Sequence, residues 1–235
     1  LVTDPYSVAL TADSRLSVVA DLASPTLKPH GWDAMPRPVR VKAATDQVIY
    51  ELHVRDFSAS DATVRPAWRG KYLAFTESAS NGMKHLKALS KAGLTDVHLL
   101  PVFDLASVPE RGCKVPDVPK APADSEAQQA AVMAVAADDC FNWGYDPWHF
   151  NAPEGSYATD PLKRVTEFRE MVMALHRAGL RVGMDMVYNH MSAAGQAPKS
   201  VLDRLVPGYY HRLNAKGEIE RSTCCDNTAT ENLMM

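Results

Sequence analysis

The sequence lacks a cationic surplus and a membrane-length apolar run. Its 25 Lys and Arg residues face 28 Asp and Glu residues, for a net charge of -3 at pH 7. Nucleic acids and acidic membrane surfaces are therefore not expected partners. No apolar run approaches the roughly 20 residues that span a bilayer, and no signal-peptide pattern follows Leu1. Because the first residue is not Met, we expect the natural start to be missing from this sequence or to have been removed by processing.

Cysteine is scarce and its spacing is unsuited to zinc or dithiol redox motifs, because no Cys-x-x-Cys pair occurs. Cys224 and Cys225 are adjacent, and their Cα atoms, about 3.8 Å apart, lie closer than in usual disulfides. Cys113 and Cys140 bracket a polar loop, whose ends a bridge would fix. From the sequence alone, each of the two cysteine pairs could form a disulfide or remain as two free thiols.

The hydrophobic content of 46% and charged content of 23% are typical of globular proteins. Residues 1–22 alternate as a hairpin does, with a turn at 11–14. Two strands cannot bury a core alone, so we expect residues 1–30 to be the end of an upstream β-sandwich domain and its linker. Prolines at 25, 29, 36 and 38 predict a stiff connector.

From residue 47 onward, apolar strands alternate with amphipathic helices. This order predicts a parallel sheet covered on both faces. The predicted strands cover residues 48–54, 95–103 and 180–188, and the predicted helices cover 82–92 and about 161–178. A long insertion occupies 104–140, and residues 125–137 within it have helical composition. Insertions of this length are uncommon unless they are functional or disordered.

Residues 185–190, Asp-Met-Val-Tyr-Asn-His, end the third predicted strand. A buried Asp185 needs a partner, and no obvious one is visible in the chain. We therefore interpret Asp185 as an organiser of the site. Asn189 and His190 lie where an α/β barrel carries its chemistry. Alternatively, His190 is a loop histidine satisfied by a backbone carbonyl.

Residues 142–147, Asn-Trp-Gly-Tyr-Asp-Pro, predict a tight turn. An aromatic platform beside a carboxylate suits a pyranose, which has apolar faces to stack and hydroxyls to bind. Trp143, Tyr145 and Asp146 are thus candidate sugar contacts. The alternative is that the two aromatic rings are buried anchors of a long loop.

Residues 185–190 resemble the first signature segment of the α-amylase superfamily. The turn at 142–147, followed by 153–157, closely resembles the corresponding loop of its starch-debranching members. Further segments resemble pullulanases, bacterial ones in particular: 4–6, 28–32, 50–58, 223–225 and 228–232. One departure is Phe141, where pullulanases usually carry Tyr, so one hydroxyl is missing.

The resemblance implies an α/β fold: the first three strands of a (β/α)8 TIM barrel over 31–235, preceded by the end of an all-β sandwich. It implies that His190 and Tyr145 contact the sugar at the cleaved bond, with Trp143 beside them. Asp146 would steady that site, and Asp185 and Asn189 would organise it.

The implied reaction is retaining hydrolysis of α-1,6 branch bonds in α-glucans such as pullulan, limit dextrin and amylopectin. In this superfamily the catalytic carboxylates follow later strands, so we expect none in this chain and no activity from it alone. The alternatives are an isoamylase-like debranching or branching enzyme and a non-catalytic glucan-binding protein with a degenerate barrel. No cofactor is expected to be required. Calcium is common in the superfamily, but no clustered oxygen-ligand motif identifies a site. Pullulanases of this type suggest a secreted or cell-surface bacterial protein.

Overall fold

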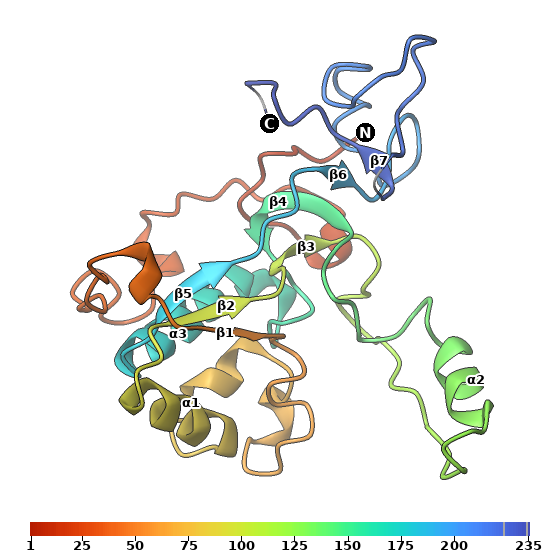
Figure 1. Ribbon diagram of the computed structural model, residues 1–235. Coiled ribbons are helices and arrows are strands. Elements are labelled where there is room, and N and C mark those ends of the chain that lie inside the picture. Colours follow the sequence, from red (N-terminus) through yellow and green to blue (C-terminus); the bar gives the residue numbers. More distant parts are fainter. Residues whose placement is uncertain (223, 234) are drawn as a thin grey trace.

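A three-stranded parallel sheet forms the centre of the computed structural model, which describes residues 1–222, 224–233 and 235 (Figure 1). Its strands are β1 (Ile49–Leu52), β2 (Asp96–Leu99) and β5 (Arg181–Met184), in the order β1-β2-β5. Their last residues are in register, so the carboxyl ends of all three strands meet at one edge.

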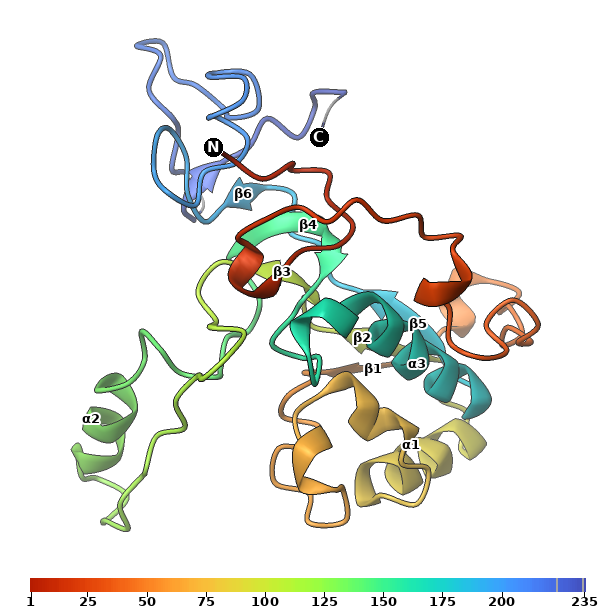
Figure 2. The same ribbon diagram turned by 180° about the vertical axis from the view of Figure 1, so that it is seen from behind.

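Two helices make the crossovers between these strands. In α1 (Asn81–Lys91) the Ser80 side chain caps the first turn, and α3 (Arg164–Arg177) follows a short turn capped by Asp160. Their apolar sides meet β2 in the main core, on one side of the sheet (Figure 2). That core consists of Leu52, Val54, Tyr72, Phe75, Met83, Leu86, Val97, Leu99, Val102, Tyr157, Ala158, Met171, Ala174, Leu175 and Leu180.

The sheet is incompletely covered. Ile49 and Tyr50 on β1 and Met184 on β5 are exposed, whereas parallel sheets are normally buried on both faces. The third strand was predicted to continue to residue 188, but it ends at Met184. After one further bond, from Asp185 N–H to Leu99 O (3.0 Å), the chain leaves the sheet. Asp185 is therefore half-buried at a strand end rather than enclosed within a strand.

The predicted insertion leaves the body after β3 (Phe103–Leu105) and returns at β4 (Pro147–Pro153), which pairs antiparallel with β3. Within it, α2 (Ala127–Met133) is shorter than the predicted helix and lies apart from the rest of the chain in both views (Figures 1 and 2). A Cys113–Cys140 disulfide joins the ends of this segment.

The two strands predicted over residues 1–22 do not form. A single antiparallel bridge joins Leu10 to Ser17, around a one-turn 3-10 helix. Partly buried hydrogen bonds attach this segment to the body instead: Arg164 donates to Thr11 O (3.3 Å), and His149 bonds the Thr3 hydroxyl (2.7 Å). These hydrogen bonds to the body, rather than the alternation of apolar residues, therefore determine the conformation of the segment.

Arg164 and His149 also belong to a cluster of buried charged residues. The carboxylates of Asp104, Glu110 and Glu154 lie within 4.8 Å of one another. Arg164 donates to Asp104 (3.2 Å) and to Glu110 (2.7 Å), and His149 contacts Asp104 at 2.6 Å. Because the guanidinium already provides the positive charge, the cluster is an ion-pair network rather than a cation site.

Residues after β5 form a second small sheet of β6 (His190–Met191) and β7 (Asp226–Asn227), which pair antiparallel. This part lies beyond β3 and β4 in Figure 1. Among the described residues, no helix is both long and apolar enough to cross a membrane. Short 3-10 helices cover Ala12–Ser14, Pro25–Leu27, Ala44–Asp46, Pro66–Trp68, Tyr72–Thr76 and Pro161–Lys163.

Candidate functional site

The turn at 142–146 crosses the carboxyl ends of all three parallel strands. At the end of β1, His53 donates from Nε2 to Asn142 O (2.7 Å). Beyond β2, Pro101 packs beneath Gly144. At the end of β5, the Tyr145 hydroxyl donates to Asp185 Oδ2 (2.8 Å). The turn is therefore fixed to the edge where α/β enzymes place their chemistry.

Gly144 is required by this arrangement. Its φ of +101° is disfavoured for residues with a side chain, and a Cβ there would lie 2.6 Å from Pro101 Cβ. The Asn142 side chain closes the turn by accepting from Gly144 N–H (2.6 Å). The backbone can thus approach β2 closely enough for Tyr145 to reach Asp185.

Tyr145 is the partner of Asp185 that the sequence did not reveal. The hydrogen bond to Asp185, with burial and the Asp185 charge, raises the pKa of Tyr145 to about 12. The phenol is thus neutral and a donor at physiological pH. This pair joins the two segments that sequence analysis singled out separately.

His190 lies next to the same tyrosine. Its ring is buried, with Nε2 donating to Tyr145 O at 2.7 Å, and Nδ1 has no hydrogen-bond partner among the described residues. The backbone carbonyl contact is the one expected for a loop histidine. The structure nevertheless places His190 and Tyr145 together, because β6 begins at His190 and runs past the turn.

The two aromatic rings of the turn are not buried anchors. Trp143 is 64% exposed and Tyr145 is 40% exposed, so both have free surface for a ligand. Asp146 is half-buried, and burial raises the pKa of its carboxyl group, whereas the nearby Ser107 and Lys199 oppose that shift. Asn189 is exposed, and its carbonyl accepts from Thr228 N–H (3.0 Å).

His53 is a site residue that sequence analysis did not single out. It is buried and also contacts the Tyr157 hydroxyl (3.1 Å), while its ring lies 5.4 Å from that of Phe141. The sequence could have identified His53 as a site residue, because it lies at the end of the first predicted strand, as His190 lies after the third.

The two thiols of Cys224 and Cys225 are free and exposed, so the bridge that the sequence left open between them is not formed. They lie beside His190. Thr223 of the same motif lies outside the described residues.

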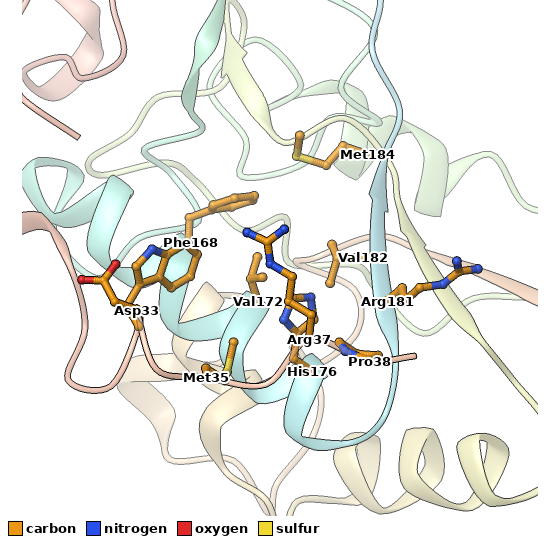
Figure 3. A pocket seen from close by; sticks show the side chains of 11 residues that line it. Asp33, Met35, Arg37, Pro38, Phe168, Val172, His176, Arg181, Val182 and Met184 are labelled. Carbon is orange, nitrogen blue, oxygen red and sulfur yellow. The ribbon is translucent and has the colours of Figure 1, made fainter. Parts of the chain in front are cut away.

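A groove of ≈ 590 Å³ lies elsewhere, between the connector, α3 and β5 (Figure 3). It does not include the turn at 142–146. Its lining consists of Trp32, Asp33, Met35, Arg37, Pro38, Phe168, Val172, His176, Arg181, Val182 and Met184.

Comparison with family models gives no match. Comparison with curated proteins gives 48% identity over 242 residues to "Pullulanase 1, chloroplastic" of Arabidopsis thaliana, covering 99% of this chain and 25% of that protein. Identity to the pullulanase of Klebsiella pneumoniae is 42% over 278 residues, covering 99% and 26%. The chain belongs with the pullulanases. It spans about a quarter of the length of these relatives.

Solved pullulanase structures agree with this assignment. The Klebsiella pneumoniae pullulanase complexed with maltotriose superposes with a TM-score of 0.89 at 42% identity, covering 97% of this chain and 26% of that one. The Paenibacillus barengoltzii pullulanase, in complex with maltohexaose and α-cyclodextrin, gives 0.79 at 34% identity, covering 100% and 33%. An isoamylase of Flavobacterium is also similar, at 30% identity over 210 residues, covering 88% of this chain and 22% of the isoamylase.

Proposed function

We propose that the polypeptide carrying this chain hydrolyses α-1,6 branch bonds in pullulan, limit dextrin and amylopectin. The observation that carries the proposal is the junction of Tyr145, Asp185 and His190 at the carboxyl edge of the sheet. Pullulanases of the same fold have been solved with maltotriose, which supports an α-glucan as the ligand of this edge.

In this proposal, the sheet is the first three strands of a (β/α)8 barrel over 31–235, with 104–140 as an insertion and 1–30 as the end of a β-sandwich domain. Three features support it: the all-parallel strand order, the helical crossovers, and the exposed residues of β1 and β5. Further strands would cover those residues and close the sheet.

Each site residue has a proposed role. Trp143 and Tyr145 offer exposed ring faces on which the CH face of a glucose unit stacks. His190 and Asp146 supply polar atoms for sugar hydroxyls. Asp185 orients the Tyr145 phenol. The Asn189 carbonyl accepts from Thr228 N–H and thereby holds residues 185–190 in place.

Retaining hydrolysis needs a nucleophile and an acid/base whose carboxyl groups are about 5–5.5 Å apart. We propose that both come from outside residues 1–235. Asp185 already accepts the Tyr145 hydrogen bond, which fits an organising role. The chain expressed alone is therefore expected to be inactive. No cofactor is proposed to be required, and assays before and after chelation distinguish this from a calcium requirement.

The test is hydrolysis of pullulan by the full-length protein, with analysis of the products. Release of maltotriose supports the proposal. Cleavage of amylopectin branches without hydrolysis of pullulan favours the isoamylase-like alternative. Binding of pullulan without any cleavage favours a non-catalytic glucan-binding protein.

A further inference from the structure

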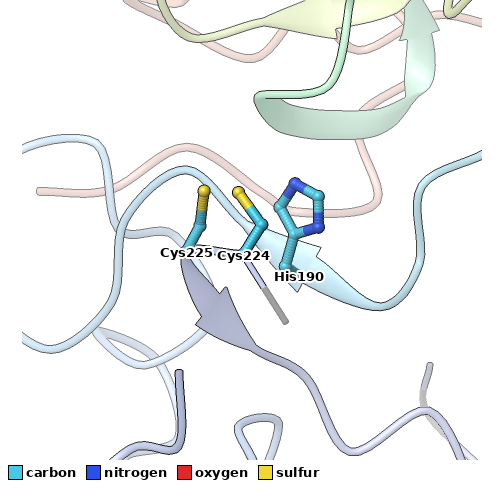
Figure 4. Close-up of side chains that lie close together, drawn as sticks. All are labelled: His190, Cys224 and Cys225. Carbon is cyan, nitrogen blue, oxygen red and sulfur yellow. The ribbon is translucent and has the colours of Figure 1, made fainter. Parts of the chain in front are cut away.

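Three potential metal ligands meet at the start of β6 and β7. One ligand atom from each of His190, Cys224 and Cys225 lies within 4.8 Å of the others. Figure 4 shows the two thiols next to each other, both pointing the same way, with the imidazole ring beside Cys224. We propose that these three side chains bind a thiophilic metal ion, with Zn²⁺ and Cd²⁺ as the probes.

The backbone explains why adjacent cysteines face the same way. Side chains of successive residues in an extended strand point to opposite faces. Cys225 has a φ of +58°, in the left-handed region that residues with a side chain rarely adopt. This conformation interrupts the alternation just before β7. The pairing of His190 with Asn227 then holds the histidine close to the thiols.

The donor set selects the class of ion. Two sulfur ligands and one imidazole suit zinc and other soft ions, and disfavour magnesium and calcium. Three protein ligands leave a fourth tetrahedral position open, and both thiols are exposed to solvent. An ion can therefore enter and leave. Typical bonds of about 2.3 Å to sulfur and about 2.0 Å to nitrogen require the three groups to move slightly closer.

Binding changes the protonation of His190. In Figure 4 the thiols lie on the side of the ring that carries Nε2 and Cδ2, and Nε2 now donates to Tyr145 O. When Nε2 ligates the ion, its proton is transferred to Nδ1, which has no partner among the described residues. Both thiols release their protons to solvent. The ion thus replaces the contact between His190 and Tyr145.

The experiment uses the full-length protein after mild reduction. Alkylation and mass measurement first establish that Cys224 and Cys225 are free, and a protein with these two sulfurs already joined overturns the proposal. Titration with Cd²⁺, followed by thiolate-to-metal charge-transfer absorption, is expected to show a saturable component of about one ion that depends on Cys224 and Cys225. The Cys113–Cys140 disulfide leaves no other thiol in residues 1–235 to contribute.

Variants assign the ligands. Cys224→Ser combined with Cys225→Ser is expected to lose the absorption. His190→Gln is expected to keep the absorption but weaken binding, and His30→Gln, which removes an exposed imidazole elsewhere, is the matched control. Unchanged binding in the double cysteine variant overturns the proposal. If a variant fails to fold, X-ray absorption of the Zn²⁺-loaded wild-type protein decides between a shell of two sulfurs and one nitrogen, as expected, and an all-oxygen shell, which overturns the proposal.

A second consequence rests on the proposed function. Because His190 is also a proposed sugar contact, maltotriose and the ion are expected to exclude each other. Saturating maltotriose should therefore raise the apparent Kd for Zn²⁺. If both ligands bind with no competition, the exclusion is wrong and the ion site stands. If maltotriose does not bind at all while Zn²⁺ does, the proposed function fails instead.

Discussion

The Tyr145 hydroxyl donates a 2.8 Å hydrogen bond to the Asp185 carboxylate, across forty residues of sequence. Tyr145 belongs to the exposed turn before β4, whereas Asp185 directly follows β5. The bond holds an aromatic ring at the carboxyl edge of the sheet, and it gives the half-buried Asp185 a hydrogen-bond donor.

Replacement of Tyr145 by Phe tests this bond. A hydrogen bond to a charged group is worth about 1.5–3 kcal/mol, so we expect kcat/KM on pullulan to fall about tenfold or more in the full-length protein. The ring remains, and Asp185 is accessible to water, so the melting temperature should change little. Tyr209→Phe, at another exposed tyrosine, is the control. Unfolding as the main effect of Tyr145→Phe would assign the bond a structural role.

Gly144 provides a second test with an internal control. Gly144→Ala places a Cβ at positive φ and against Pro101, whereas Gly217→Ala has positive φ with no atom within 4 Å of its Cβ. The backbone penalty is about 1–2 kcal/mol in both variants. The contact with Pro101 adds about 1–3 kcal/mol at Gly144. Thermal unfolding should show a larger loss for Gly144→Ala, accompanied by weaker binding of maltotriose. Equal losses would mean that the turn is not pressed against β2.

The buried carboxylates make stability depend on pH. Burial, followed by the charges of Asp104 and Glu110, raises the pKa of Glu154 to about 8. The folded state therefore binds a proton that the unfolded state has released, and this contribution to stability is lost as the pH rises toward 8. Urea unfolding of the full-length protein should give a free energy of unfolding that falls between about pH 5 and about pH 8, with a smaller fall in Glu154→Gln. A rise over this range would contradict the protonation of Glu154.

The thiol count follows from the two cysteine pairs. Cys113 and Cys140 are joined, and Cys224 and Cys225 are free. Titration of the denatured, non-reduced residues 1–235 should therefore find about two free thiols. A count near four would remove the bridge at the base of the insertion. A count near zero would place a second bridge between the adjacent cysteines.

The order of the parallel strands was predictable because their apolar runs and the helical spacing between them are local patterns. The end of β5 was not predictable, because residues 186–188, Met-Val-Tyr, remain apolar and β-prone after the chain leaves the sheet. Residues 1–22 were mispredicted for a related reason. Their alternation favours strands, but contacts with Arg164 and His149, more than 130 residues away, determine their conformation.

The candidate site was partly visible in the sequence. The two segments around Tyr145 and His190 were recognised, but nothing local to either shows that they touch. The role of His53 also depends on distant residues, since its partners are Asn142 and Tyr157. The proximity of His190 to two adjacent thiols likewise depends on the pairing of β6 with β7.

The central claim is that the turn at 142–146 and His190 form one wall of an α-glucan site. The most direct measurement is a crystal structure of the full-length protein with maltotriose. We predict a glucose ring in van der Waals contact with Tyr145 or Trp143 and a hydroxyl within hydrogen-bond distance of His190 or Asp146. Maltotriose bound only elsewhere, with the turn left in contact with water, would contradict the account.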